Sequence, residues 1–249
     1  MSAPVYHKAA IVTGAAGSLG QVISAHLLEA GFHVCLTDID TAPLDGFAAQ
    51  FEANHAMIAR LDVRDAYSWQ SVIEQVKAQW GGIGVLVNNA ALTKTTPIFE
   101  ISADEFDAVT AIAMKGTFLG CQLVGQKMRD QGYGRIINMA SLAGQNGGAA
   151  TGAHYAAAKG GIMTLTKVFA RELAANGVTV NAISPGPLDL ESVRKLLPAE
   201  KLEAVTKSIP AGTLGDAQYV AQIVALLASP QAASAIGSTF DVNGGLYLR

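Results

Sequence analysis

The sequence predicts an α/β fold: a doubly wound parallel sheet of about seven strands with helices on both faces. Short apolar runs recur along the 249 residues, and they are continuous rather than alternating, as expected for strands buried on both faces. Longer segments with helical spacing separate these runs. Strands that alternate with helices form βαβ units, and right-handed crossovers then leave few topologies.

Each apolar run is assigned to a strand, and a third strand is placed just before Asp62. The runs lie at residues 9–14, 33–38, 85–90, 135–140, 178–184 and 239–242. The predicted helices lie at residues 18–31, 66–80, 102–130, 153–176 and 216–228. Glycines at the ends of the apolar runs mark turns. No internal repeat or linker interrupts the series, so we expect a single domain over residues 1–249.

Composition limits the classes of partner. With 50% hydrophobic and 15% charged residues the chain suits a compact protein with a well-buried core. The net charge is −3 and no long basic block is present, which argues against nucleic acid as a partner. Cys35, Cys121 and the five histidines show no metal-ligand spacing, so we expect reduced thiols and no metal site.

Neither a secretory leader nor a membrane span is predicted. Residues 1–14 lack a basic stretch followed by a long apolar one, and no uncharged run approaches the roughly 20 apolar residues of a span. We therefore expect a cytoplasmic protein without a membrane partner.

Residues 187–215 differ from the rest of the chain. Pro187, Pro198 and Pro210 break this segment, and charges of both signs decorate it. It follows a strand at the carboxyl edge of the predicted sheet, where open α/β folds bind ligands. A substrate lid over 187–215 is one interpretation, and a plain surface insertion of helices is the other.

A nucleotide site is predicted where the first strand ends. The turn at residues 13–20 contains Gly14, Gly17, Ser18, Leu19 and Gly20. Its small residues let the backbone approach a pyrophosphate at a helix N-terminus.

Asp38 closes the second strand, where its carboxylate can accept hydrogen bonds from both ribose hydroxyls of an adenosine. It would repel a 2′-phosphate, and neither Ala16 nor Ile39 offers a cation, so NAD is favoured over NADP. An exposed Asp that merely opens a turn is the alternative.

Three polar residues suggest chemistry beside that nucleotide. Tyr155 and Lys159 are four residues apart, on one face of a predicted helix. Ser141 follows the strand at 135–140 and lies fourteen residues before Tyr155, so both are expected at the same sheet edge.

This pattern resembles the short-chain dehydrogenase/reductase family, single-domain oxidoreductases with a Rossmann fold, along essentially the whole chain. The motifs that carry the resemblance are the glycine turn at 13–20, Asp38, Asp62-Val63, Asn88-Asn89-Ala90, Ser141, Tyr155 with Lys159, Asn181 with Pro185-Gly186, and Val242-Asn243-Gly244-Gly245.

The resemblance implies hydride transfer between NAD and a secondary alcohol or ketone. It assigns Tyr155 as the proton donor or acceptor, Ser141 as the group that polarises the substrate oxygen, and Lys159 as the cation on the nicotinamide ribose. We expect Lys159 and oxidised nicotinamide to lower the pKa of the Tyr155 phenol. Further cofactor contacts implied are Asp62, Val63, Asn89, Ala90, Pro185, Gly186 and Leu188. The family commonly assembles through helices, which implies a homo-oligomer, a tetramer or a dimer.

The chain departs from the family pattern at four positions. Ser18 replaces a motif glycine, and Ala91 ends a motif that usually reads NNAG. Ala113 stands where the family carries an asparagine that anchors a water in the proton path, which puts that relay in doubt. Leu190 replaces a threonine that usually contacts the nicotinamide carboxamide.

The substrate itself is not predicted beyond a small or medium uncharged hydroxy compound. Expected substrate contacts are Ser141, Leu142, Gln145, Tyr155 and Pro187, with Thr93, Leu188 and Val193 as further pocket candidates. Lys94 or Arg194 are the cations that would reach the pocket. His154 precedes Tyr155, so one interpretation places it in the pocket; the other, which is favoured, places it on the solvent side of its helix.

Three alternative functions stay open. A 3-oxoacyl thioester reductase is disfavoured by Asp38, because that biosynthetic branch generally prefers NADPH. A nucleotide-binding protein with little catalysis is suggested by Ala113 and Leu190. A methyltransferase shares the glycine turn and the acidic residue, but has no use for Ser141, Tyr155 and Lys159.

Overall fold

The computed structural model describes residues 5–52, 54–148, 151–196 and 198–249, which form the predicted doubly wound sheet. Seven parallel strands lie in the order β3-β2-β1-β4-β5-β6-β7. Their bounds are β1 Ala9–Thr13, β2 His33–Asp38, β3 Ala56–Arg60, β4 Val85–Asn88, β5 Gly134–Met139, β6 Val178–Pro185 and β7 Thr239–Val242. The strand order changes direction between the neighbours β1 and β4. A ligand is therefore expected at the carboxyl ends of these two strands.

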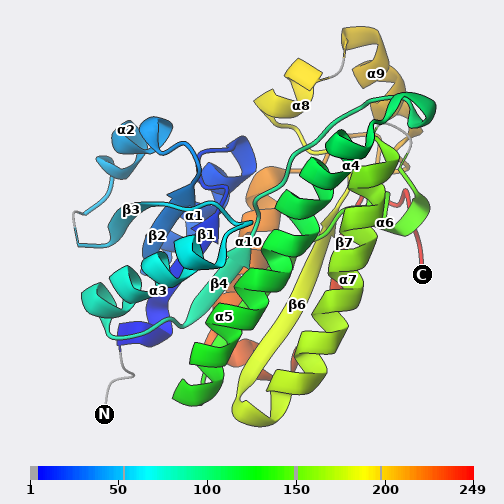
Figure 1. Ribbon diagram of the computed structural model, residues 1–249. Coiled ribbons are helices and arrows are strands. Elements are labelled where there is room, and N and C mark those ends of the chain that lie inside the picture. Colours follow the sequence, from blue (N-terminus) through cyan, green and yellow to red (C-terminus); the bar gives the residue numbers. More distant parts are fainter. Residues whose placement is uncertain (1–4, 53, 149–150, 197) are drawn as a thin grey trace.

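Helices cover both faces of the sheet (Figure 1). The longer ones are α1 Ser18–Glu29, α3 Ala66–Trp80, α4 Ala103–Thr110, α5 Gly116–Gln131, α7 Ala153–Leu173, α9 Ala199–Ser208 and α10 Ala217–Ala228. The short ones are α2 Asp45–Ala48, α6 Ala143–Asn146 and α8 Glu191–Leu196. Residues of α3, α5 and α7 share one buried cluster with the sheet, whereas residues of α1 and α10 share another.

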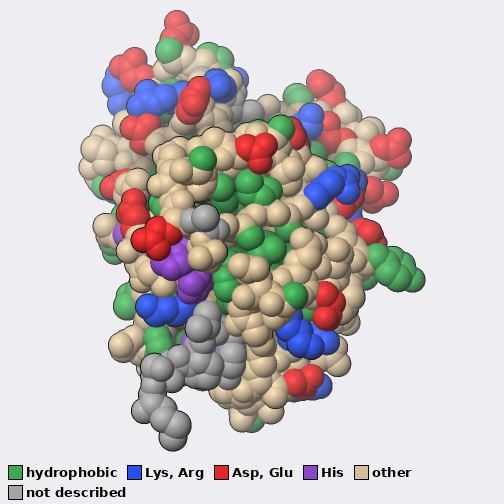
Figure 2. All heavy atoms as spheres, turned by 90° about the vertical axis from the view of Figure 1, so that its left-hand side faces the viewer, with side chains coloured by type: hydrophobic (Ala, Val, Ile, Leu, Met, Phe, Trp, Pro, Cys, Tyr) green, Lys and Arg blue, Asp and Glu red, His purple; other side chains and the backbone are tan. Residues whose placement is uncertain are grey.

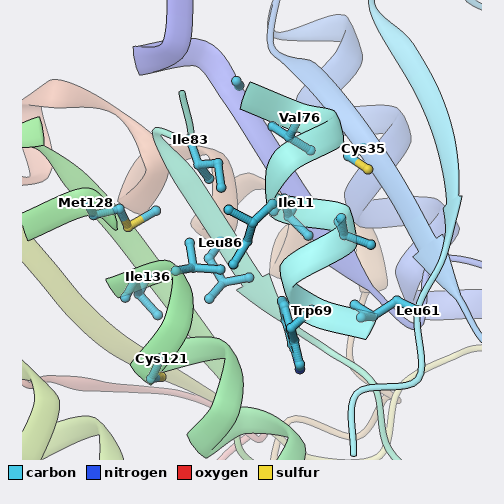
Figure 3. Close-up of a cluster of buried hydrophobic side chains, with 14 of the residues drawn as sticks. Ile11, Cys35, Leu61, Trp69, Val76, Ile83, Leu86, Cys121, Met128 and Ile136 are labelled. Atoms are coloured by element: carbon cyan, nitrogen blue, oxygen red, sulfur yellow. The ribbon is translucent and has the colours of Figure 1, made fainter. Parts of the chain in front are cut away.

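The first of these clusters holds α3 and α5 against the sheet. Figure 3 shows Trp69 of α3 and Met128 of α5 with the strand side chains Ile11, Leu86 and Ile136, all of them fully buried. Side chains of this size gain about 1.5–3 kcal/mol each when they leave water. The cluster therefore fixes the sheet as the rigid platform from which the strand ends project.

The predicted helix at 102–130 is not one regular helix. A π-helical segment, Ala111–Lys115, lies between α4 and α5 and contains Ala113. The extra residue per turn shifts the face of the helix at this point, and π-segments often accompany functional sites.

The continuous stretch Ala103–Gln131 is long and apolar enough to cross a membrane by length and composition. In the structure, however, Cys121, Val124 and Met128 on this stretch are buried against the sheet and its neighbouring helices. That is the arrangement of a core helix, which passes the same test of length and composition.

The two ends of segment 187–215 are joined to each other beyond the end of β6. Leu188 and Gly215 form an isolated parallel bridge, in which Gly215 N donates to Pro187 O (2.9 Å) and Asp189 N to Gly215 O (2.9 Å). Between these ends the chain forms α8 and α9, which stand above the sheet in Figure 1; residue 197 lies outside the described residues. In Figure 2 the same projecting part carries charges of both signs, paired as Lys195 with Glu191 and Lys207 with Glu203.

Candidate active site

A cavity of about 1010 Å³ lies along the carboxyl ends of β1, β2, β4, β5 and β6. The residues that the sequence placed at the cofactor or the substrate line this cavity, except Gln145 and the two candidate cations Lys94 and Arg194. Thr93, Leu188 and Val193 line it as well, together with Leu190, Val205 and Ser208 of segment 187–215 and Leu246 near the C-terminus.

The glycine turn leaves the backbone at the cavity wall. Gly14 has a positive φ of 65°, and a Cβ atom there would lie 2.9 Å from Ala90 Cα. A Cβ atom on Gly20 would lie 2.1 Å from the Gly14 oxygen. Gly17 is the N-cap of α1 and supplies no side-chain acceptor to the first helical turn. The amides of that turn therefore remain available for an anion.

Asp38 is the last residue of β2 and lines the cavity there, whereas Tyr155 lines it near the end of β5. Its Oδ2 accepts from Ala16 N (3.1 Å) and its Oδ1 from Ile39 N (2.8 Å), which fixes the carboxylate beside the glycine turn. Oδ1 also accepts from Asp40 N (3.4 Å), whereas Oδ2 keeps a lone pair for a further donor. The nearby Arg64 lines the cavity, but its guanidinium is bidentate to Asp62, with Nε–Oδ1 at 2.9 Å and Nη2–Oδ2 at 2.7 Å.

Asn89 supports the turn from β4. Its Nδ2 donates to the carbonyl oxygens of Thr13 (3.0 Å) and Gly14 (3.1 Å). The Thr13 hydroxyl in turn accepts from the backbone amide of Asn89 at 2.9 Å. These bonds tie the end of β1 to the end of β4, so the glycine turn is held in one conformation.

Tyr155 lies at the first turn of α7 and lines the cavity together with Ser141 and Thr93. The side chains of Ser141 and Thr93 are the polar groups that act on its phenol. Burial raises the pKa of Tyr155 above its ordinary value, and these two groups only partly offset this effect. The expected lowering of the phenol pKa is therefore not a property of the protein alone, because the polar groups around Tyr155 do not outweigh its burial.

Lys159 is buried one turn further along α7, with 3% of its surface exposed. Its Nζ donates to the carbonyl oxygen of Met139 at 2.5 Å and lies 5.5 Å from the centre of the Tyr155 ring. Burial lowers the pKa of Lys159 to about 8. An ammonium has three donors, so two of them remain for a ligand in the cavity.

Ala113 is fully buried in a small apolar cluster. Its neighbours there are Ala140, Ala158, Ile162 and Ala182, with Met163 packed against them. The side chain offers no polar atom, so the Met139 carbonyl is the protein group that holds Lys159 on this side.

Gln145, His154 and the two candidate cations differ from the sequence interpretation. Gln145 does not line the cavity, and its amide donates to Asp241 (2.7 Å) and accepts from Ser184 (2.9 Å). His154 is not on the solvent side: it is fully buried, and its Nε2 lies 2.9 Å from a carboxylate oxygen of Glu105. Arg194 pairs with Asp189 at 2.7 Å, and neither it nor Lys94 lines the cavity.

A series of buried side-chain hydrogen bonds, which the sequence did not predict, lies between β4, β5 and α7. Asn88 Nδ2 donates to Asn138 Oδ1 (2.8 Å), and Asn138 Nδ2 donates to the Thr166 hydroxyl (2.9 Å). This series joins β4, β5 and α7, and so fixes the strand before Ser141 against the helix that carries Tyr155. The signal was an asparagine inside an otherwise apolar strand run, which demands a buried partner.

Metal ligands are not gathered anywhere in the described ranges: no group of three His, Cys, Asp or Glu side chains there could hold an ion.

Comparisons with known proteins agree with this geometry. The model of a protein family described as Enoyl-(Acyl carrier protein) reductase matches residues 14–247. The chain is 36% identical over 241 residues to the 3-oxoacyl-(acyl-carrier-protein) reductase of Vibrio cholerae, covering 97% of this chain and 98% of that protein. It is 37% identical over 242 residues to the acetoacetyl-CoA reductase of Shinella zoogloeoides, covering 97% and 99%. The 3-oxoacyl-(acyl-carrier-protein) reductase of Escherichia coli is 35% identical over 243 residues, covering 97% and 98%.

Proposed function

The chain belongs to the short-chain dehydrogenase/reductase family of oxidoreductases, and on that premise we propose that it is an NAD-dependent enzyme that interconverts a secondary alcohol and a ketone. The observation that carries the proposal is the cavity itself, which brings Ser141, Tyr155 and Lys159 together with Asp38 and the glycine turn.

The residues present fit a dinucleotide. Gly14 and Gly20 leave no room for a Cβ atom, the first turn of α1 presents its amides, and Asp38 keeps acceptor capacity for a ribose diol. Lys159 offers donors within the same cavity. When bound, NAD supplies the hydride acceptor of the reaction.

Tyr155 moves the proton. With an alcohol in the cavity, its phenolate oxygen takes the hydroxyl proton, and in the reverse direction the phenol returns it. Ser141 donates to the same substrate oxygen and orients it, because its side chain lines the cavity beside Tyr155. The Lys159 ammonium, 5.5 Å from the ring centre, favours the phenolate.

The substrate end of the cavity favours an uncharged compound. Its wall is largely apolar, formed by Leu142, Pro187, Leu190, Val193, Val205 and Leu246. Because α8 and α9 contribute part of this wall, we assign segment 187–215 as the lid of a single-domain enzyme.

We also propose a homo-oligomer in the cytoplasm. Met114, Phe118 and Val168 lie exposed on the outer side of the π-helical segment, α5 and α7, and apolar side chains in such positions favour association. Light scattering after size-exclusion chromatography is expected to give a dimer or a tetramer, and a monomer would contradict this part of the proposal.

A 3-oxoacyl thioester reductase is the second candidate, because several relatives at 34–37% identity are named 3-oxoacyl-(acyl-carrier-protein) reductase or acetoacetyl-CoA reductase. Asp38 separates the two candidates, since a carboxylate at this place opposes the 2′-phosphate of NADPH.

The test is a turnover assay with cyclic, aliphatic and sugar-like secondary alcohols and with acetoacetyl-CoA, using NAD and NADP in parallel. We expect NADH formation from an alcohol. The matched variant Tyr155→Phe keeps the ring but lacks the proton, so it is expected to lose about 10²–10⁴ in kcat while it still binds NADH. A variant that keeps most of its activity would remove the role of Tyr155. Reduction of acetoacetyl-CoA with NADPH alone would favour the second candidate.

A further inference from the structure

His154 and Glu105 form a buried contact that the proposed chemistry does not use. His154 lies in the first turn of α7, immediately before Tyr155, and Glu105 lies in the first turn of α4. Nε2 of the fully buried imidazole is 2.9 Å from Glu105 Oε1, whereas 26% of the Glu105 side chain remains exposed. The pair therefore joins two helices that are far apart in sequence, beside the proposed proton-transfer residue.

The hydrogen bonds define the state of the ring. Nδ1 of His154 accepts from the backbone amide of Tyr155 at 2.9 Å, so it carries no proton. Nε2 must then be the protonated nitrogen, and it donates to the Glu105 carboxylate. The Tyr155 amide is also 3.1 Å from Gly152 O, so it keeps an acceptor even without the imidazole. Nε2 of His154, in contrast, has Glu105 as its hydrogen-bond partner.

The segment 91–97, which follows β4, lies beside the same pair of residues. The Thr96 and His154 side chains are the neighbours that hold the pKa of Glu105 below its ordinary value. Lys94 O accepts from Gly152 N at 2.8 Å, next to the start of α7. Thr93 in this segment lines the cavity together with Tyr155. Glu105 is thus the point where α4, the segment 91–97 and the first turn of α7 are joined.

Packing leaves the imidazole one position. A Cβ atom on Gly152 would lie 2.3 Å from Cε1 and 2.7 Å from Nδ1 of His154. The ring lies directly over the Gly152 backbone, so it cannot turn without losing the bond to Glu105.

We propose that the Glu105–His154 pair positions Tyr155 relative to Thr93 and Ser141, as a latch between α4, the segment 91–97 and α7. The two residues act through Tyr155 and touch neither substrate nor cofactor, so they are positioning residues. The effect on turnover rests on the proposed function, whereas the latch itself is a property of the fold.

Two substitutions of His154 separate its hydrogen bonds. The amide nitrogen of Gln reaches the place of Nε2, so His154→Gln keeps the bond to Glu105, whereas the shorter His154→Asn keeps only an acceptor near Nδ1. We expect His154→Asn and Glu105→Ala each to lower kcat about tenfold, because small misplacements of reacting groups are costly. The Kd for NADH should stay unchanged, and His154→Gln should stay close to the wild type. Asp104→Ala, which removes the neighbouring acid from the same turn of α4, is the matched control and should leave kcat unchanged.

The double variant tests whether the two residues act as one. If they form a latch, His154→Asn with Glu105→Ala should lower kcat no further than either single change. Additive losses, equal losses in His154→Asn and His154→Gln, or a weakened NADH Kd with unchanged kcat would each overturn the proposal.

A readout without turnover separates this proposal from the proposed function. Hydrogen–deuterium exchange of the peptide covering residues 151–160 should be faster in His154→Asn and Glu105→Ala than in His154→Gln and Asp104→Ala. If the wild type turns over no alcohol but exchange follows this order, the proposed function fails and the latch stands. Equal exchange in all four variants would overturn the latch whatever the activity.

Discussion

Lys159 donates its hydrogen bond to the carbonyl oxygen of Met139, 2.5 Å away, and so α7 is fastened to the end of β5 by a buried ammonium. A dipole is a weaker partner for a cation than a carboxylate, and burial accordingly lowers the pKa of Lys159 to about 8. The protein thus carries an incompletely compensated charge at the place where we propose that the cofactor binds. Such a residue is expected to reduce stability and to serve function.

Removing that ammonium should stabilise the protein without ligand. A pKa lowered to about 8 from 10.5 corresponds to about 3 kcal/mol of unfavourable burial, which the substitution removes. The Met139 oxygen then loses its donor, which costs about 1–2 kcal/mol. Lys159→Met is therefore expected to raise Tm by about 2–4 °C and to weaken NADH binding. Thermal melting and NADH fluorescence titration measure the two effects. A lower Tm would show that the Met139 bond outweighs the burial of the charge.

The gain in stability should depend on pH in a defined direction. The folded protein binds this proton less tightly than the unfolded chain, so the penalty is complete below about pH 8 and fades as pH rises toward 10.5. Between pH 7 and pH 9.5 the advantage of Lys159→Met over the wild type should shrink by about 2 kcal/mol. Urea unfolding of both proteins at the two pH values checks this, because other titrating groups cancel in the difference. A constant difference would contradict the assigned pKa.

Asp38 should determine the choice of nucleotide. Asp38→Ala removes a carboxylate fixed by Ala16 N and Ile39 N beside the glycine turn. Charge-assisted hydrogen bonds are worth roughly 1.5–3 kcal/mol, so the ratio of kcat/KM for NAD to that for NADP should fall about 10–100-fold. Asp40→Ala, an exposed neighbour, should leave the ratio unchanged. An unaltered ratio in Asp38→Ala would place the specificity elsewhere.

Gly20 should tolerate no side chain. Its Cβ atom would lie 2.1 Å from the Gly14 oxygen, so Gly20→Ala must displace the glycine turn. We expect a loss of about 1–3 kcal/mol in the free energy of unfolding, together with loss of NADH binding. Gly46→Ala in α2 is the control, because a Cβ atom there meets nothing within 4 Å. Equal stability of the two variants would show that the turn adapts.

Much of the fold could be predicted because strands that are buried on both faces have continuous apolar sequences. The runs at 33–38 and 239–242 coincide with β2 and β7, and the predicted helix at 66–80 coincides with α3. Helices α8 and α9 gave no such signal, since they are mostly exposed. The π-helical segment at Ala111–Lys115 was also missed, because one extra residue in a turn hardly changes the apolar spacing of a long helix.

Within the site, residue types and spacing predicted which residues meet, but not the direction of each side chain. Gln145 lies four residues from Ser141 yet is captured by Ser184 and Asp241, which are remote in sequence. His154 is buried because Glu105, 49 residues away, supplies a partner. The pKa of Tyr155 depends on the sum of burial and the effects of two polar neighbours, which only the three-dimensional structure gives.

The Leu188–Gly215 bridge joins the two ends of segment 187–215 where it leaves and re-enters the body of the protein. Because its ends are already fixed, a change in the length of this excursion alters the closure entropy only slowly and does not disturb the sheet. The cavity wall formed by Val193 and Val205 can therefore differ between relatives while Asp38 and the glycine turn keep their places. Segment 187–215 can therefore be exchanged as a unit. Replacing it with the same segment of a relative should transfer the substrate preference of that relative, whereas the preference for NAD over NADP should stay unchanged.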